Sequence, residues 1–227
     1  MSVNPQTRTD RIADRFAAIK AEGRPGLVVF MTVGHPYRDA ALEIAPQLAA
    51  AGADAIELGM PFSDPMGEGP VIQESSFVAL QNGVTTQDCL DTAAAVRPDI
   101  GDTPLILMGY YNPVLSYGLE RFARACAAAT VDGLIIVDLP YTEAEPLVGH
   151  LEPFGIHLIP LLAPTSTDES IAQSVRFGGG FVYCISVTGV TGTRSELSDS
   201  PGLWNVDGVR QQTDLPVAGG SVSHPGA

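Results

Sequence analysis

The chain has 227 residues, of which 45% are hydrophobic, and it includes 24 glycines and 18 prolines. This length and composition predict one globular domain with many tight turns and exclude a disordered chain. A net charge of −14 argues against nucleic acid or an anionic membrane surface as a partner. Three unpatterned cysteines indicate a reducing compartment, and the lack of a signal-like or membrane-spanning apolar run predicts a cytoplasmic protein.

After a first amphipathic helix over residues 8–21, apolar runs and helix-like stretches alternate along the chain. The apolar runs predict strands at residues 27–33, 54–58, 104–109, 133–138, 156–162, 181–186 and 215–218. The stretches between them predict helices at 38–51, 71–81, 85–97, 118–129, 142–152, 167–177 and 203–212. Strands that are apolar on both faces and separated by helices are typical of a parallel sheet covered by helices. Repeating βα units of roughly 25 residues fit an α/β fold of the (β/α)8 barrel type. The alternative is an open Rossmann sheet, but no GxGxxG motif follows the first predicted strand.

The predicted barrel is one unit short. A closed barrel needs an eighth strand and helix, whereas the sequence ends at Ala227, just after the seventh predicted strand. The final residues, GGSVSHPGA, have turn chemistry and no strand pattern. We therefore expect a single TIM-barrel domain over residues 1–227 that lacks its C-terminal segment and has unpaired edges on its first and seventh strands. A truncated or frameshifted sequence explains this ending better than an evolved variant does.

The stretch DAIELGMPFSDPMGEGP, residues 54–70, carries a strong functional signal. Glu57 is an acid inside an apolar strand, and Glu68 follows on the loop after that strand. Because active sites of barrel enzymes lie at the C-terminal ends of the strands, the two glutamates are candidates for acid–base chemistry. Burial would raise the pKa of Glu57 toward working pH. The alternative is that Glu57 is a structural acid paired with a neighbour. Asp64 and Asp138 are also acids near predicted strand ends, but both lie near prolines and can equally form turns.

The segment SVTGVTGTRSELSDSPG after the sixth predicted strand is rich in glycine, serine and threonine. This composition fits a mobile lid with Gly189 and Gly192 as hinges, and it fits simple surface disorder equally well. The position of the segment directly after a buried strand favours the lid. The four histidines and three cysteines show no metal-ligand spacing, so no metal site is expected.

Several segments taken together resemble the α subunit of tryptophan synthase. They are, in chain order, FMTVGHP, GADAIELGMPFSDPMGEGPVIQ, LILMGYYNPVLSYG, VDGLIIVDLPYTEAE, LIPLLAPTST and FVYCISVTGVTGTR. The resemblance runs from the first helix to about Val217 and implies a (β/α)8 barrel. It further implies a carbon–carbon lyase of tryptophan biosynthesis that cleaves indole-3-glycerol phosphate to indole and glyceraldehyde 3-phosphate. It implies no cofactor in this subunit, and an α2β2 complex with a β subunit that holds pyridoxal phosphate.

The resemblance also implies roles for individual residues. Glu57 matches the glutamate that protonates the indole ring at C3 and relays the proton, and Glu68 matches an aspartate that binds the indole N–H. The expected substrate-binding residues are Phe30, Ile72, Met108, Tyr110, Tyr183, Thr191, Gly192, Gly219 and Ser221. The expected residues of the partner interface are Pro61, Asp64 and Asn112.

The sequence departs from the family pattern in three respects. Glu68 is one methylene longer than the family's aspartate, which predicts lower activity, since a displacement of about 1 Å can cost on the order of 100-fold in rate. Gly220 replaces a phenylalanine that closes over indole, and Ser221 replaces a glycine. With the eighth strand and the phosphate-binding helix missing, only a turn at residues 219–221 remains for the phosphate. Two alternatives stay open: a stand-alone lyase that releases indole, and a non-catalytic chain that only docks on the β subunit.

Overall fold

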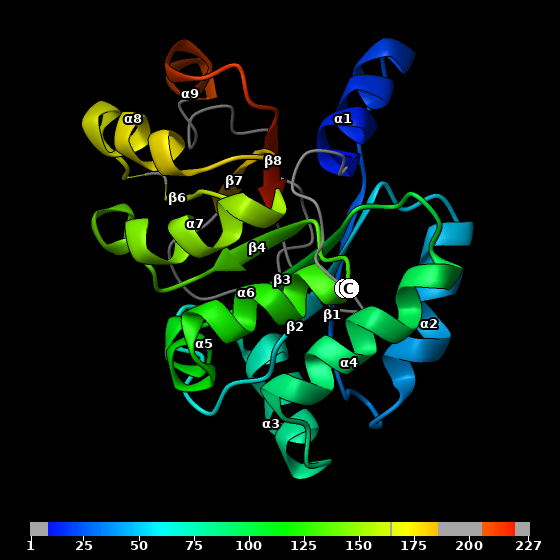
Figure 1. Ribbon diagram of the computed structural model, residues 1–227. Coiled ribbons are helices and arrows are strands. Elements are labelled where there is room, and N and C mark those ends of the chain that lie inside the picture. Colours follow the sequence, from blue (N-terminus) through cyan, green and yellow to red (C-terminus); the bar gives the residue numbers. More distant parts are fainter. Residues whose placement is uncertain (1–8, 164, 186–205, 221–227) are drawn as a thin grey trace.

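The computed structural model describes residues 9–163, 165–185 and 206–220 (Figure 1). Its strands are β1 (Val28–Thr32), β2 (Ala55–Gly59), β3 (Leu105–Gly109), β4 (Gly133–Ile136), β5 (His157–Leu158), β6 (Leu161–Leu162), β7 (Val182–Ile185) and β8 (Val217–Gly220). A five-stranded sheet has the order β1-β2-β3-β4-β5, and a three-stranded sheet has the order β6-β7-β8. All the pairings are parallel. In both sheets each strand pairs with the strand that follows it in the chain, as in a (β/α)8 barrel.

Helices connect the strands and cover their outer side (Figure 1). The α-helices are α1 (Arg11–Glu22), α2 (Ala40–Ala50), α3 (Pro70–Gln81), α4 (Thr86–Val96), α5 (Tyr111–Tyr117), α6 (Leu119–Ala128), α7 (Glu145–Leu151), α8 (Asp168–Phe177) and α9 (Val206–Gln212). Short 3-10 helices are η2 (Arg97–Asp99), η3 (Tyr141–Glu143) and η4 (Glu152–Phe154). In the described part of the chain, no helix is long and apolar enough to cross a membrane. The arrangement is a partial (β/α)8 barrel, which confirms the fold class predicted from the sequence.

Local sequence explains where several helices begin and end. The Asp10 side chain accepts a hydrogen bond from the Ala13 N–H and so caps the start of α1. Gly23 ends α1 with a φ of 66°, a left-handed conformation that glycine adopts without strain. Thr85 and Asp88 form a reciprocal capping box at the start of α4. These caps satisfy backbone groups that a helix leaves unpaired at its ends.

The predicted strand at residues 156–162 is divided into β5 and β6. Ile159 and Pro160 separate the two, because proline has no N–H to donate to a strand ladder. The Ile159 N–H donates to Leu134 O at 2.8 Å, whereas Pro160 O accepts from the Tyr183 N–H at 2.9 Å. The chain therefore changes its hydrogen-bonding partner from β4 to β7 at this point, and the two short strands occupy one position of the barrel.

Helix α5 is not predicted by the sequence analysis, because Asn112 and Pro113 have the composition of a turn. The carboxylate of Asp138, which lies just after β4, accepts a hydrogen bond from the Tyr111 N–H at 2.7 Å. This contact satisfies a backbone donor in the first turn of α5. Asp138 therefore has a structural contact at the position where the sequence left a turn-forming role open.

Side chains of β1 to β5 alternate between two apolar clusters, and a third cluster lies around β6 and β7. The outer cluster lies between strands and helices and includes Ile56, Leu58, Leu105, Leu107, Leu134 and Ile136. The inner cluster contains Ile12, Ala55, Ile106, Ile135, Ile159 and Phe181. Because successive residues of a strand face opposite sides, Glu57 faces the barrel interior with Ala55, between two residues that face outward.

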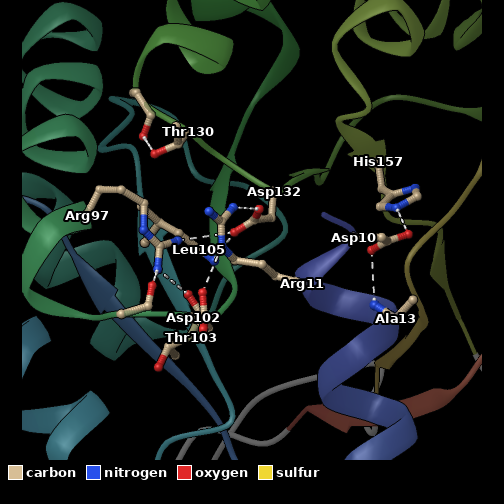
Figure 2. A network of polar contacts seen from close by, with 12 residues as sticks. Asp10, Arg11, Ala13, Arg97, Asp102, Thr103, Leu105, Thr130, Asp132 and His157 are labelled. Carbon is tan, nitrogen blue, oxygen red and sulfur yellow. Dashed lines mark hydrogen bonds and ion pairs between the residues drawn. The ribbon is translucent and has the colours of Figure 1, made fainter. Parts of the chain in front are cut away.

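Helix α1 is held against the N-terminal ends of the strands by a buried carboxylate (Figure 2). Ile12 of α1 is fully buried in the inner cluster. The Asp132 carboxylate accepts hydrogen bonds from Arg11 at 3.0 Å, from Arg97 at 3.3 Å and from the Leu105 N–H at 2.9 Å. One buried acid therefore joins the start of β4 to the start of β3, to α1 and to the residue after α4.

Asp54 repeats this arrangement in front of β2. Its carboxylate accepts two hydrogen bonds from Arg24, at 2.7 and 2.8 Å, and one from the Leu27 N–H at 2.8 Å. The hydrogen bonds from Arg24 are the main cause that lowers the pKa of this carboxyl group. A third contact joins α1 to β5, where His157 Nε2 lies 2.8 Å from the Asp10 carboxylate (Figure 2).

Candidate active site

Glu57 lies in β2 and is 2% exposed. In the strand register, Phe30 of β1 and Ile106 of β3 flank it. One oxygen of its carboxyl group, Oε1, has no hydrogen-bond partner among the described residues. A buried polar atom without a partner costs roughly 1–3 kcal/mol. Buried structural carboxylates are normally paired, so Glu57 is in the state expected of a group that takes part in chemistry.

Burial is the main cause that raises the pKa of Glu57 from 4.5 to about 7, and the negative charge of Glu68 adds to it. Both lost hydration and a like charge disfavour the ionised form, so the carboxyl group keeps its proton until near neutral pH. A group that titrates near pH 7 can donate and accept a proton in one cycle. The direction of the change agrees with the expectation from the position of Glu57 in an apolar strand.

Glu68 lies half-buried on the loop after β2. Its N–H donates to Pro65 O at 3.0 Å, and its carbonyl oxygen accepts from Gln73 Nε2 at 2.9 Å. These contacts fix the backbone of the residue between the loop and α3. Burial raises the pKa of its carboxyl group as well. The structure thus brings the two predicted catalytic residues near enough for the charge of one to act on the other.

A small cavity lies beside Glu68 at the C-terminal ends of β1, β2 and β3. Five residues predicted for the site line it, namely Phe30, Glu68, Ile72, Met108 and Tyr110. Its volume is about 20 Å³, which is room for about one water molecule. An indole ring therefore requires lining side chains to move. Met108 is suited to this, because its flexible side chain changes shape at low cost.

Seven further residues, to which the sequence assigned no role, line this cavity: Thr32, Gly59, Met60, Pro65, Ser76, Gly109 and Val137. Thr32 Oγ1 lies 2.7 Å from Ser75 Oγ in a buried hydrogen bond between β1 and α3. Thr32 follows Phe30 by two residues and shares its face of the strand, which is the signal that could have identified it. Met60 and Val137 are the first residues after β2 and β4, a position that favours active-site residues in a barrel.

Two glycines at the strand ends leave room for the large side chains of Phe30 and of Met60, which belongs to the outer cluster. A Cβ atom at Gly59 would lie 2.5 Å from Cζ of Phe30, and a Cβ atom at Gly109 would lie 2.6 Å from Cε of Met60. Any side chain at these positions would displace the covering residue. The glycines therefore determine how deeply Phe30 and Met60 reach over the strands.

Tyr183 lies in β7, packed against the inner cluster. Burial raises the pKa of its hydroxyl group, and the charges of Glu57 and Glu68 add to this effect. The charges of both carboxyl groups therefore act on this phenol. It is absent from the lining of the small cavity beside Glu68.

The residues predicted for a partner interface follow two neighbouring strands: Pro61 and Asp64 lie on the loop after β2, and Asn112 lies in the first turn of α5 after β3. Asp64 and Asn112 are exposed, and Pro61 is half-buried. Met66, on the same loop as Asp64, is 91% exposed. A large apolar side chain this exposed at one rim of the barrel is typical of a contact surface when polar residues surround it.

Part of the predicted site lies outside the described residues. Thr191, Gly192 and Ser221 belong to this part, as does the predicted lid. The prediction of a turn at residues 219–221 is wrong for Gly219 and Gly220, which continue β8 opposite Cys184 and Ile185 of β7. The ladder persists there because pairing with a neighbouring strand needs only backbone groups, which glycine provides.

Comparisons with known proteins identify the family. A family model described as tryptophan synthase alpha chain matches residues 16–225. The tryptophan synthase alpha chain of Caulobacter vibrioides is 52% identical over 212 residues, which cover 93% of this chain and 76% of the relative. That of Roseiflexus castenholzii is 48% identical over 211 residues, which cover 92% and 80%.

Solved structures agree with this result. Tryptophan synthase subunit alpha from Legionella pneumophila has a TM-score of 0.85 at 33% identity, over 95% of this chain and 79% of that chain. A structure of Mycobacterium tuberculosis tryptophan synthase has a TM-score of 0.84 at 37% identity, over 93% of this chain and 80% of that chain. The chain therefore belongs to the tryptophan synthase alpha chain family.

Proposed function

We propose that this chain cleaves indole-3-glycerol phosphate to indole and glyceraldehyde 3-phosphate, as the alpha subunit of a tryptophan synthase. Family membership supports this reaction, a carbon–carbon lyase step of tryptophan biosynthesis. The observation that carries the assignment of residues is the buried carboxyl group of Glu57, whose pKa of about 7 suits proton transfer.

Breaking the carbon–carbon bond requires indole to leave as a neutral ring. Glu57 donates its proton to C3 of the indole, which places a positive charge on the ring nitrogen. The hydroxyl group on the adjacent glycerol carbon then loses its proton to Glu57. The bond from that carbon to C3 breaks, and its electron pair returns to the ring. The products are an aldehyde and neutral indole, and Glu57 has regained the proton that it donated.

Glu68 stabilises the charge that develops on the ring. A fixed carboxylate that accepts a hydrogen bond from the indole N–H offsets the positive charge where it appears. This scheme needs Glu57 protonated and Glu68 ionised at the start of the reaction. Activity should therefore rise with pH as Glu68 ionises and should fall as pH passes about 7, where Glu57 loses its proton.

The apolar walls for the ring come from Phe30, Ile72, Met108 and Tyr110, which line the cavity beside Glu68. The small size of this cavity supports a site that opens when the substrate enters. Tyr183 does not line this cavity, and the charges of the two carboxyl groups act on its hydroxyl group.

We further propose that the chain docks on a tryptophan synthase beta subunit, to which the pyridoxal phosphate belongs. The exposed residues Asp64, Met66 and Asn112 support a contact surface at the rim of the barrel that holds Glu68. Indole released beside this rim has a short path to a partner that covers it. No cofactor is needed for the proton transfers assigned to the two glutamates.

Indole release from indole-3-glycerol phosphate tests this proposal, measured with and without a beta subunit. Glu57→Gln keeps the shape of the side chain and removes the transferable proton, so it should abolish turnover. The exposed Glu120, which pairs with Arg124 on the surface, provides a matched control. Glu120→Gln should leave turnover unchanged.

The outcomes separate the alternatives. Turnover that is lost in Glu57→Gln and stimulated by the beta subunit supports the proposal. Turnover that the beta subunit does not change would indicate a stand-alone lyase. Binding to the beta subunit without indole release would indicate a chain that only docks, and it would refute the catalytic assignment of Glu57.

A further inference from the structure

The loop that carries Glu68 is attached to the barrel by Tyr110. Tyr110 directly follows β3 and is 7% exposed. Its hydroxyl oxygen accepts a hydrogen bond from the Gly67 N–H at 3.2 Å. Its ring stacks on Phe62, with ring centroids 5.0 Å apart and an interplanar angle of 26°. Because Phe62 and Gly67 lie near the two ends of the loop, one side chain holds the loop at two points.

Gly67 lies against Val137 and Tyr110, the residues that follow β4 and β3. A Cβ atom at this position would lie 3.0 Å from Cγ1 of Val137 and 3.5 Å from the hydroxyl oxygen of Tyr110. The next residue, Glu68, donates its N–H to Pro65 O, so residues 65–68 form a hydrogen-bonded turn. This turn is local, whereas the bond to Tyr110 crosses 43 positions of sequence. Tyr110 therefore attaches this turn to the end of β3, in addition to the hydrogen bond that Gln73 of α3 donates to Glu68 O.

We propose that Tyr110 is a positioning residue for Glu68, whose hydroxyl group fixes Gly67 and thereby sets where the Glu68 carboxylate meets the substrate. This role rests on the proposed function and is additional to the place of the Tyr110 ring in the wall of the indole pocket. This positioning role of Tyr110 matters more where residue 68 is a glutamate than where it is the shorter aspartate. A longer side chain has more rotamers, so its backbone must be held firmly for the carboxylate to be preorganised.

The position of Glu68 also affects the pKa values of Tyr110 and Glu57. Burial is the main cause that raises the pKa of Tyr110 to about 12, and the charge of Glu68 adds to it. The phenol therefore stays neutral at working pH and remains an acceptor for the Gly67 N–H. The charge of Glu68 also raises the pKa of Glu57. If Glu68 moved toward water, this repulsion would weaken and the pKa of Glu57 would fall.

Tyr110→Phe tests the inference, because it keeps the ring that stacks on Phe62 and removes the acceptor for Gly67. A matched control is Tyr117→Phe, which removes a hydroxyl group that donates to Gln87 Oε1 at 2.6 Å on the protein surface. We expect kcat of Tyr110→Phe to fall by between about 5-fold and 100-fold, with KM changed by less than about 3-fold. The alkaline limb of its pH–rate profile should move to lower pH. Tyr117→Phe should match the parent in all three quantities.

A double-mutant cycle with Glu68→Gln decides whether Tyr110 acts through Glu68. If it does, Tyr110→Phe costs little further kcat in a chain that already carries Glu68→Gln. Independent, additive losses would overturn the proposal. So would a Tyr110→Phe variant that changes KM alone, which would leave Tyr110 as a wall of the pocket.

Amide hydrogen exchange of the loop gives a readout that does not require turnover. Peptides that cover residues 61–69 should exchange faster in Tyr110→Phe than in the parent, and at the parent rate in Tyr117→Phe. Unchanged exchange in Tyr110→Phe would overturn the proposal, whether or not the chain is active. If the parent chain shows no turnover, the proposed function fails, whereas faster exchange in Tyr110→Phe would still support the attachment of the loop by Tyr110.

Discussion

Replacing the buried acid Glu57 by glutamine should stabilise the folded chain at alkaline pH. The pKa of Glu57 is raised from 4.5 to about 7 by burial and by the charge of Glu68. A carboxyl group whose pKa is higher in the folded chain contributes stability that is fully present below pH 4.5 and is lost as pH rises through 7. Glutamine resembles the protonated acid and does not ionise, so Glu57→Gln avoids this loss.

The size of the effect follows from the difference in pKa. Each unit of pKa corresponds to about 1.4 kcal/mol, so a change from 4.5 to about 7 corresponds to about 3 kcal/mol. Glu57→Gln should therefore have nearly the parent stability at about pH 4 and should exceed it by about 3 kcal/mol above about pH 8. Because Glu57 is 2% exposed, solvent screening does not reduce this figure much.

Urea unfolding followed by circular dichroism measures this difference at both pH values, with the parent and the variant compared at the same slope m. Glu120→Gln is the control, because the pKa of Glu120 changes in the opposite direction: the hydrogen bond from Arg124 lowers the pKa of this exposed carboxyl group. Its stability should not rise with pH relative to the parent. A Glu57→Gln chain that is less stable than the parent at alkaline pH would refute the reasoning, and so would a stability difference independent of pH.

Two structural predictions concern opposite ends of the barrel. Asp132→Ala removes a buried carboxylate that accepts hydrogen bonds from Arg11, Arg97 and the Leu105 N–H, so it should lower the free energy of unfolding by about 3–5 kcal/mol. Urea unfolding measures this loss, and a loss as small as that of Glu120→Gln would contradict the prediction. Gly59→Ala places a Cβ atom 2.5 Å from the ring of Phe30, so it should lower kcat/KM at least about 10-fold by moving that ring, as steady-state indole release would show. Unchanged kcat/KM in a folded Gly59→Ala chain would mean that Phe30 does not need its observed position.

Periodicity predicts the strands of this barrel because local pattern determines which residues face each cluster. The apolar run around Glu57 predicts a strand, and β2 begins within one residue of its predicted start. The structure adds that Ile56 and Leu58 face outward, which leaves Glu57 on the inner side. The interruption at Pro160 was readable from the missing N–H of proline. The prediction of a single strand at residues 156–162 followed the apolar run and overlooked the break that Pro160 introduces.

Contacts between distant segments could not be predicted in this way. The bond from Gly67 to Tyr110 joins residues 43 positions apart, and the bond from Arg11 to Asp132 joins residues 121 positions apart. No local spacing records such partners, because the fold and not the chain brings them together. The sequence therefore indicates which residues carry chemistry, whereas the groups that hold them in place emerge only from the structure.

The buried carboxylates of the barrel differ in a way that bears on whether Glu57 is structural. Asp54 and Asp132, at the N-terminal ends of the strands, are each engaged by arginine side chains and a backbone N–H. Glu57 has comparable burial but has a raised pKa, and one of its oxygens has no partner among the residues that the structure describes. A structural acid at the C-terminal ends should resemble the two aspartates, because an unpaired buried carboxyl group lowers stability. We infer that the stability lost at Glu57 is the cost of keeping a proton available there, which is why the same substitution should remove activity and stabilise the fold.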